Sequence, residues 1–247
     1  MNPKISFVMP TKNREGIIRQ AIQSIIAQDM PEWELVIVDD HSNPEDKTRD
    51  IVLSLADDRI KYIRIPDNFA GGIPCARNFG NIFARSQIIA VADSDDISLP
   101  HRARVTIESF ENNNCDVFYA GYEVFNKTNN EMKEIKHPVV DFDLELLKQR
   151  NFIPHGSSAY KRVIAYQFPY NSFFRVAEDY DFFSRLAEAE KNFYFCNQKV
   201  YQYVLHQDNI TSGKKCDDYD NLIKAIRGWS DNSAEISLDK IANSNNT

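Results

Sequence analysis

Short apolar runs alternate with amphipathic stretches through the first half of the chain. Four apolar runs have the length of strands, at residues 5–9, 35–38, 60–65 and 88–92. Between the first two, apolar side chains recur at the three- and four-residue spacing of one helix face, at Ile18, Ala21, Ile22, Ile25 and Ile26. Further helices are expected over residues 45–55 and from about Pro74 onward. This alternation predicts an α/β fold with a doubly wound, mostly parallel sheet flanked by helices.

Beyond residue 98 strands and helices no longer alternate regularly. The pattern predicts helices at residues 98–112, 142–147 and 178–190, and strands at residues 116–125, near 135, about 156–160, 193–195 and 200–205. These elements indicate a smaller, mixed second-half sheet. Because no internal repeat or linker interrupts the pattern, residues 1–229 are interpreted as one domain with halves 1–98 and 99–229. Residues 230–247 are rich in serine and asparagine, which predicts a flexible tail.

The composition excludes several classes of protein. The chain has 247 residues and 43% hydrophobic content, which is enough for a packed core. Its formal net charge of -7 disfavours a nucleic-acid partner, because phosphates require basic residues. The cysteines are widely spaced, so neither a zinc site nor a disulfide framework is expected. Without a signal-peptide pattern or an apolar run of about 20 residues, we expect a cytoplasmic protein with no transmembrane segment, free or peripheral at the inner face of the cell membrane.

Carboxylates gather where two of the predicted strands end. The fourth apolar run stops at Asp93, and Asp95 and Asp96 follow closely. The second run stops at Asp39 and Asp40. The carboxyl ends of parallel strands share one edge of the sheet, which is where ligands bind in open α/β folds. Carboxylates crowded there require a divalent cation or sugar hydroxyls to offset their repulsion, unless they form a solvated acidic turn that caps the next helix.

Two common phosphate-binding motifs are absent from the sequence. The pattern GxxxxGK[ST] does not occur, which excludes a P-loop, and no GxGxxG follows a strand, which disfavours a dinucleotide site. The two acidic clusters therefore suit other tasks: one can hydrogen-bond a base or ribose, and the other can bind a cation. Hard oxygen ligands favour Mg²⁺ or Mn²⁺.

Four segments in order resemble the motifs of family 2 glycosyltransferases with the GT-A fold: residues 7–14, 36–42, 71–78 and 92–96. The resemblance extends over residues 4–210, and it is the order and spacing of the motifs that make it specific. It implies an inverting, metal-dependent transfer of a sugar from a nucleotide-diphosphate donor. In that case residues 1–98 would bind the nucleotide, and residues 99–229 would bind the acceptor.

The resemblance also implies roles for residues that hold the nucleotide. Pro10 and Thr11 would line its pocket, and Asp40 would accept a hydrogen bond from the N3–H of uracil or thymine. Asn68 and Arg77 would reach the base or its ribose. A UDP-sugar is therefore the expected donor, ahead of a dTDP-sugar. A saccharide or lipid-linked saccharide in bacterial surface-polysaccharide or glycolipid assembly is the expected acceptor.

The same resemblance assigns the acids of the fourth motif. Asp93 would contact the ribose, and Asp95, the closing acid of the DxD motif, would bind Mn²⁺ or Mg²⁺ at the diphosphate. Asp96 is an additional candidate for orienting the metal or the sugar. His206 resembles a late histidine that completes the metal site in many relatives, although a single histidine after a strand is commonly a turn residue.

A fifth segment, residues 176–182, resembles the family's Glu-Asp pair at the start of a helix. Asp179 would be the catalytic base, since an inverting transfer requires a carboxylate to take the proton of the incoming hydroxyl. Glu178 is an additional candidate. The alternative is structural, because acids in the first turn of a helix complement its dipole. By position alone, His155 is a candidate for the acceptor side.

Two other functions compete with this hypothesis. A sugar-phosphate nucleotidyltransferase also uses acids and Mg²⁺ at strand ends, but its first loop is usually rich in glycine, and residues 10–13 contain none. A non-catalytic saccharide-binding module on the same fold is the other alternative. The presence of Asp93, Asp95 and Asp179 together argues against it.

Overall fold

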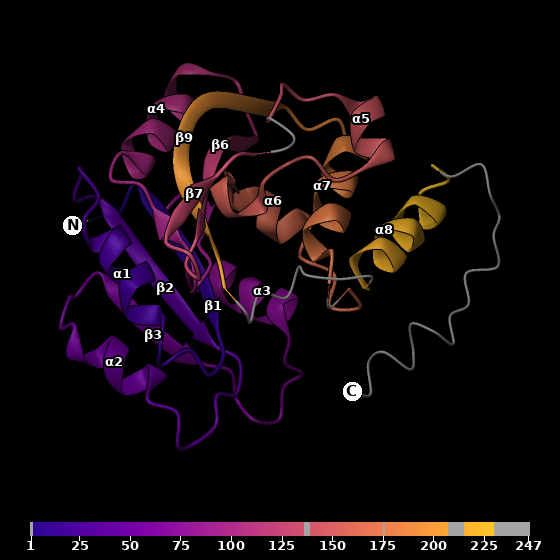
Figure 1. The fold of residues 1–247 in the computed structure, drawn as a ribbon. Coiled ribbons are helices and arrows are strands. Elements are labelled where there is room, and N and C mark those ends of the chain that lie inside the picture. Colours follow the sequence, from indigo (N-terminus) through magenta and orange to yellow (C-terminus); the bar gives the residue numbers. More distant parts are fainter. Residues whose placement is uncertain (1, 136–138, 175, 207–214, 230–247) are drawn as a thin grey trace.

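The computed structural model of the chain describes residues 2–135, 139–174, 176–206 and 215–229 (Figure 1). Its strands are β1 (Ile5–Thr11), β2 (Trp33–Asp39), β3 (Ile60–Arg64), β4 (Ile88–Val91), β5 (Ile97–Ser98), β6 (Val117–Asn126), β7 (Glu131–Lys133), β8 (Ala159–Lys161) and β9 (Phe193–Leu205). Its helices are α1 (Ile18–Ile26), α2 (Thr48–Ser54), α3 (Ile73–Phe83), α4 (Arg102–Asn112), α5 (Leu144–Gln149), α6 (Arg162–Gln167), α7 (Glu178–Glu188) and α8 (Lys215–Ile226), with a 3-10 turn at His155–Ser157. The predicted tail, residues 230–247, lies outside the described residues.

One sheet runs through both halves of the described chain, in the order β3-β2-β1-β4-β8-β6-β9-β5, with β7 paired to β6. The four strands of the first half, β3, β2, β1 and β4, are parallel. Strand β8 then pairs antiparallel with β4, so the direction of the sheet reverses where the halves join. Beyond it, β6 and β9 are parallel to each other, while β5 is antiparallel to β9. The predicted fold class, a mostly parallel sheet continued by a mixed one, is confirmed.

Helices cover both faces of this sheet (Figure 1). On one face, α1, α2 and α4 pack over a core that contains Phe7, Leu35 and Phe118. On the other face, α5, α6, α7 and α8 enclose a second core that contains Val91 and Tyr160, and α3 covers a smaller cluster beside it. Each strand of the centre therefore buries both of its faces, which explains why these strands are continuous apolar runs rather than alternating ones.

The strand register brings three carboxyl ends to one edge. Thr11 at the end of β1 pairs with Asp39 at the end of β2. Val8 pairs with Val91, so the chain leaves β4 and reaches Asp93 beside the end of β1. The acids that follow β2 and β4 consequently lie on either side of the loop after β1, as the parallel pattern predicts.

The largest departure from the predicted elements is β9. Two short strands were expected because the polar residues Asn197, Gln198 and Lys199 separate two apolar runs. The structure has one long curved strand, in which the register against β6 shifts on both sides of Gly121. A Cβ on Gly121 would lie 3.1 Å from the carbonyl oxygen of Gln198, so glycine lets the bulge approach. The polar run is therefore a bulge rather than a turn.

Other helix and strand boundaries differ from the predicted ones for local reasons. Helix α5 begins at Leu144 because the Asp143 side chain accepts a hydrogen bond from the Leu146 N–H and caps it. The predicted strand at 156–160 begins within the 3-10 turn, and its last two residues are the start of β8 at Ala159. Elements β5, α6 and α8 were not predicted. Among the described residues, no helix has both the length and the apolar character that a bilayer crossing requires.

Candidate functional site

A cleft of about 770 Å³ lies at the carboxyl ends of the parallel strands, and both halves of the chain contribute to its walls. Of the residues predicted from sequence, those that line it are Pro10, Thr11, Asp40, Arg77, Asp93, Asp95, Asp96, Glu178 and Asp179. His206, the residue directly after β9, contacts Asp95. Asn68 does not line the cleft: it is exposed in the loop after β3. The cleft therefore unites residues that lie up to 210 positions apart, from Pro10 to Asp220.

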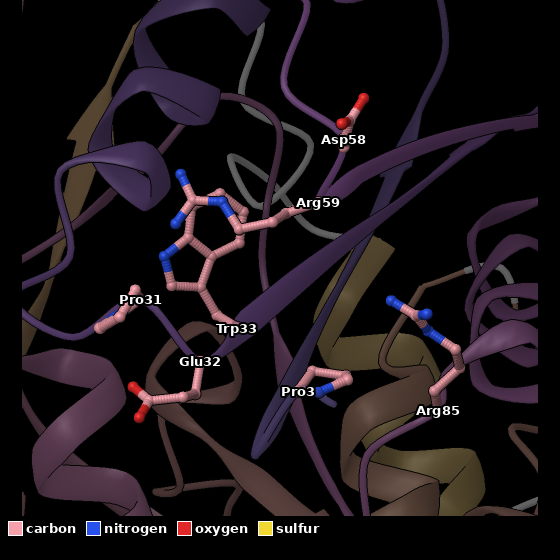
Figure 2. A pocket seen from close by; sticks show the side chains of 7 residues that line it. All are labelled: Pro3, Pro31, Glu32, Trp33, Asp58, Arg59 and Arg85. Carbon is pink, nitrogen blue, oxygen red and sulfur yellow. The ribbon is translucent and has the colours of Figure 1, made fainter. Parts of the chain in front are cut away.

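A second cavity, of about 280 Å³, lies at the opposite edge of the sheet (Figure 2). Its walls come from residues just before or at the amino ends of β1, β2 and β3, including Pro3, Trp33 and Arg59. The Arg59 guanidinium lies over the Trp33 ring at 3.7 Å from the centroid. None of the predicted site residues lines this cavity, so the cleft at the carboxyl ends is the candidate site.

Asp40 is fixed at one end of the cleft by contacts with the glycine loop that precedes α3. Its Oδ2 accepts a hydrogen bond from the Gly72 N–H at 2.9 Å, and its Oδ1 lies 3.1 Å from His41 Nδ1. A Cβ on Gly71 would lie 2.3 Å from Asp40 Oδ1, so the loop can approach this closely only with glycine there. Both carboxylate oxygens are therefore held in place at the mouth of the cleft.

The neighbouring acid, Asp39, has a structural role instead. It is 1% exposed and accepts hydrogen bonds from the Tyr62 hydroxyl at 2.6 Å and from Arg64 at 2.9 Å. Burial acts to raise the pKa of Asp39, but these contacts and those from Ser42 outweigh it and lower the pKa below its ordinary value. Of the two acids after β2, only Asp40 faces the cleft.

Arg77 links the two halves beneath the cleft floor. Its side chain is buried, with Nη2 at 3.1 Å from Asp93 Oδ1 and Nε at 3.6 Å from Glu178 Oε1. Burial favours the neutral guanidinium, but the Asp93 and Glu178 charges outweigh it and raise the pKa of Arg77 above its ordinary value. Arg77 Nη1 and Thr11 Oγ1 are buried and have no hydrogen-bond partner among the described residues. Most buried polar groups in proteins have a hydrogen-bond partner, either a protein group or water, so these two atoms are exceptions.

Asp96 is buried in a network under the other acids. The Tyr201 hydroxyl donates a hydrogen bond to it, and the Val204 N–H donates another at 2.6 Å. Burial, with the charges of Asp93 and Asp95, raises the pKa of Asp96 to about 8. The Tyr201 hydroxyl also lies 3.5 Å from Asp93. Asp96 therefore connects the acidic loop to β9 and is almost fully buried in the wall of the cleft.

Two further contacts pack this network tightly. A Cβ on Gly156 would lie 2.2 Å from the Tyr201 ring, so the 3-10 turn reaches the tyrosine only through glycine. Arg102 lies beneath, with Nη1 at 3.0 Å from Ser98 Oγ and Nη2 at 2.5 Å from the Val91 carbonyl oxygen. Burial lowers the pKa of Arg102 to about 10.

Asp95 and His206 form the part of the site that fits a divalent cation. Asp95 Oδ2 lies 3.1 Å from His206 Nε2 and 3.6 Å from Arg14 Nη2, so a nitrogen ligand and a cationic group already face this carboxylate. No cluster of three or more potential metal ligands is present within the described residues. Mg²⁺ commonly uses one or two carboxylates and takes its other ligands from substrate phosphates and water, so this donor set fits such an ion.

The candidate base lies at the start of α7. Asp179 Oδ2 accepts a hydrogen bond from Asn151 Nδ2 at 2.9 Å, and its Oδ1 accepts one from the Tyr180 N–H. Burial outweighs these contacts and raises the pKa of Asp179 above its ordinary value. Burial likewise raises the pKa of Glu178, to about 7, against the opposing charge of Arg77. The residue before the pair, Ala177, has φ of 59°, a strained conformation of a kind that concentrates at functional sites.

The far wall of the cleft is aromatic. Tyr122 and Tyr203 project into it from β6 and β9, and Phe152 faces it from the segment after α5. Aromatic faces of this kind stack against sugar rings and apolar groups. His155 lines the same wall, where its Nε2 lies 2.8 Å from the Tyr170 hydroxyl. Burial and the charge of Arg77 hold the pKa of His155 well below its ordinary value, so this histidine is neutral.

Several residues of the site were not identified from sequence as functional, among them Arg14, Asn151 and Tyr201. Arg14 lies within a segment that resembles a family motif, which is a signal that could have been used. Asn151 and Tyr201 follow no local pattern, because each is placed only by the tertiary fold. Arg77 was expected at the base or ribose, whereas its guanidinium lies between two carboxylates of the cleft.

Comparison with known proteins identifies the family. The model of glycosyl transferase family 2 matches residues 6–181, and the chain belongs to this family. Its fold is that of S. aureus TarS: the TM-score is 0.71 against TarS residues 1–349 in complex with UDP, at 19% identity over 96% of this chain and 69% of that one. The same region of TarS in complex with UDP-GlcNAc gives 0.71, at 18% identity over 89% of this chain and 66% of that one.

Two curated relatives are bacterial enzymes. The UDP-Glc:alpha-D-GlcNAc-diphosphoundecaprenol beta-1,3-glucosyltransferase WfgD of Escherichia coli is 36% identical over 49% of this chain and 47% of its own length. The GalNAc(5)-diNAcBac-PP-undecaprenol beta-1,3-glucosyltransferase of Campylobacter jejuni is 27% identical over 85% of this chain and 68% of its own length. The chain thus spans about half of the first relative and two thirds of the second.

Proposed function

We propose that this chain is an inverting glycosyltransferase. It transfers a sugar from a nucleotide-diphosphate donor, a UDP-sugar, to a saccharide or lipid-linked saccharide during assembly of a bacterial surface polysaccharide or glycolipid. The observation that carries the proposal is the convergence of Asp40, Asp95 and Asp179, from three separate segments, on one cleft. The names of its relatives support it, because they include UDP-bound TarS and glucosyltransferases acting on undecaprenol-linked saccharides.

The nucleotide occupies the end of the cleft formed by the first half. There Asp40 is held by the Gly72 N–H with its carboxylate at the cleft surface, where it accepts the N3–H of uracil. Pro10 and Thr11 line the same end. Asp93, anchored by Arg77, is placed for the ribose.

Asp95 and His206 would hold Mn²⁺ or Mg²⁺ at the donor diphosphate. When bound, this ion neutralises the negative charge that the departing nucleoside diphosphate carries. Arg14, at 3.6 Å from Asp95, adds positive charge on the same side. These residues therefore favour departure of UDP, while the acids deeper in the cleft remain available for the acceptor.

Asp179 acts as the base on the acceptor. The acceptor oxygen attacks the anomeric carbon from the face opposite UDP, forming the new C–O bond as the bond to the diphosphate breaks. UDP takes the bonding electron pair, and the acceptor proton passes to the Asp179 carboxylate. Because burial raises the pKa of Asp179, its ionised form binds that proton more strongly than an ordinary aspartate does.

A donor-binding experiment tests the proposal. Thermal unfolding is measured with UDP, dTDP, GDP and ATP, each with and without Mn²⁺, and hydrolysis of each nucleotide sugar is scored in parallel. We expect UDP to raise Tm, more strongly with Mn²⁺, and a UDP-sugar to be hydrolysed slowly. Stabilisation by a nucleoside triphosphate with a sugar phosphate would instead indicate a nucleotidyltransferase.

The catalytic role of Asp179 is tested by substitution. Asp179→Asn should leave the Tm shift by UDP intact and lower transfer by about 10³-fold, because the amide cannot accept the proton. Asp50→Asn is the matched control, since Asp50 is an exposed acid in the first turn of α2 and should have no effect on either quantity. Equal loss of UDP binding and transfer in Asp179→Asn would remove Asp179 from the role of base.

A further inference from the structure

Two neighbouring helices, α3 and α6, present large apolar side chains to solvent. Ile82 and Phe83 at the end of α3 are 62% and 45% exposed, and Val163 and Tyr166 on α6 are 49% and 55% exposed. Val163 and Tyr166 are three residues apart, so they lie on one face of their helix. These four side chains, together with Arg85 and Arg162, are called the α3–α6 surface below.

The four apolar side chains lie on two neighbouring helices. The helices contact each other, and α6 lies beside α3 in Figure 1. Arg162 at the start of α6 donates a hydrogen bond to the Ala84 carbonyl oxygen just after α3, at 3.1 Å. The end of α3 therefore meets the beginning of α6, which brings Phe83 and Val163 into the same region. Several large apolar side chains exposed on neighbouring elements are typical of an interaction site.

The charge of this surface differs from that of the rest of the chain. The protein has 36 acidic residues and a net charge of -7, yet residues 68–92 and residues 146–177 contain neither aspartate nor glutamate. These two segments include all of α3 and α6. Arg162 donates to a backbone carbonyl rather than to a carboxylate. Arg85, whose side chain is 51% exposed, pairs with Glu34, which is fully buried.

We infer that the α3–α6 surface binds a bilayer that contains anionic phospholipid. Apolar side chains beside arginines fit the boundary between the acyl chains and the negatively charged headgroups of a bilayer. The apolar side chains insert among the acyl chains, and the arginines pair with the phosphates of the headgroups. A soluble anion would leave the apolar groups without a partner. A second copy of the chain would also cover these apolar side chains, and the sedimentation measurement below distinguishes the two occupants.

The surface also places the cleft at a suitable height above a membrane. Ile73 and Arg77, at the start of α3, line the cleft, while Ile82 and Phe83 lie at the other end of the helix. Eleven residues of helix extend about 16 Å. Docking through the end of α3 thus holds the cleft within reach of the lipid headgroups. The inference itself rests on exposure and charge and does not depend on the proposed reaction.

Vesicle cosedimentation tests the inference. The protein is mixed with vesicles of phosphatidylcholine alone or of phosphatidylcholine with phosphatidylglycerol, without donor or acceptor. We expect binding to the anionic vesicles only, with affinity that falls as salt is added. The double variant Phe83→Ser, Val163→Ser should bind about tenfold more weakly, and Arg162→Gln several-fold more weakly, as expected for lost insertion and lost charge.

Leu53→Ser is the matched control. Leu53 is 56% exposed on α2, which covers the other face of the sheet, so its loss should leave vesicle binding unchanged. Tm and the UDP-induced shift of each variant show that folding and the cleft are intact. Equal losses in Leu53→Ser and the double variant would overturn the inference, and so would absence of binding to anionic vesicles.

Self-association is measured in the same samples by sedimentation velocity. A dimer that the Phe83→Ser, Val163→Ser change dissociates, with no vesicle binding in the unaltered protein, would assign the surface to a second copy and refute the lipid inference. Because no sugar nucleotide is present, each of these outcomes leaves the transferase proposal to its own tests.

Discussion

At the scale of single residues, Asn151 holds the proposed base in position. Its Oδ1 accepts the Ile153 N–H at 3.3 Å, which turns its Nδ2 toward Asp179 Oδ2 at 2.9 Å. An N–H donated to a carboxylate stabilises the ionised form, so this contact opposes the burial that raises the pKa of Asp179. Asn151 is therefore a positioning residue that also keeps the base ionised.

The pH profile of transfer should reveal this role. Asn151→Ala removes the donor, so the pKa of Asp179 rises further and the acid limb of kcat/KM moves to higher pH, with a loss of about tenfold at the optimum. Asn151→Asp, which has nearly the same size and lacks the donor, should move the limb in the same direction. Glu178, with a pKa of about 7, and Arg77 face the same region. The acid limb of the profile therefore reports the combined titration of Glu178 and Asp179.

Glu178→Gln supplies the control for that assignment, because it removes the second titrating group. The Asn151→Ala shift should persist in the Glu178→Gln background. An acid limb that stays at its original pH when Asn151 is replaced would show that the amide does not stabilise the carboxylate.

The metal site has its own residue-scale prediction. Asp95→Ala should abolish the increase in UDP affinity that Mn²⁺ produces, measured by titration calorimetry, while affinity without metal changes little. His206→Ala should reduce the metal effect without abolishing it, because one carboxylate and the diphosphate still coordinate the ion. Asp50→Ala, remote from the cleft, should leave the metal effect intact. A metal response that survives in Asp95→Ala would exclude Asp95 as a ligand.

The candidate site was partly readable from the sequence. Asp40, Asp93 and Asp95 could be predicted because each follows a buried strand, and parallel strands end at one edge. The contacts of Asn151 and Tyr201 could not be, because these residues reach the cleft from elements whose positions depend on the reversal of the sheet at β8. Local sequence carries no information about which loop meets which acid across 28 or more residues.

At the scale of elements, α3 packs against β1 through a glycine. A Cβ on Gly80 would lie 2.3 Å from Val8 Cγ1 and 3.3 Å from Val38 Cγ2. Gly80→Ala should therefore lower the free energy of unfolding by about 1–3 kcal/mol through overpacking, even though alanine favours the helix by up to about 1 kcal/mol. Urea unfolding at pH 7 measures the change.

Two companion variants make that prediction specific. Gly16→Ala, where no other atom lies within 4 Å, should change the free energy of unfolding by less than about 0.5 kcal/mol. Val8→Ala creates room, so combining it with Gly80→Ala should cost less than the sum of the two single changes. Strict additivity would contradict a clash between these two positions.

The elements themselves were predictable in proportion to their regularity. In the first half each central strand is buried on both faces and each helix has an apolar stripe, so pattern alone located them. In the second half β5 is two residues long, α6 is six, and β9 contains a bulge within a polar run. Such elements owe their existence to tertiary packing, which a local pattern does not record.

At the scale of the whole molecule, one sheet joins the two halves, so they should unfold together. Each half has a tryptophan: Trp33 begins β2, and Trp229 packs against the second core after α8. The Trp33→Phe variant retains Trp229 and reports on the second half, and the Trp229→Phe variant retains Trp33 and reports on the first half. We expect the fluorescence of the two variants to give the same urea midpoint, after correction for each variant's stability by circular dichroism. UDP should raise both midpoints equally, because residues of both halves line its cleft.

Separate midpoints would have a definite meaning. If Trp229 reported an earlier transition than Trp33, α8 or the second half would unfold on its own, and the shared sheet would not impose cooperativity. A UDP effect on only one of the two signals would place the nucleotide outside the shared cleft.

The antiparallel contact between β4 and β8 involves three residue pairs, Ile88 with Lys161, Ile89 with Tyr160 and Ala90 with Ala159. Every candidate nucleotide contact lies before residue 99 in the chain, and the aromatic wall and Asp179 lie after it. The portions before and after residue 99 can therefore be exchanged separately between relatives, provided that the ion pair between Arg77 and Glu178 is kept. Chimeras joined near residue 99 are the engineering counterpart: they would retain donor preference and acquire the acceptor selectivity of whichever relative supplies the remainder.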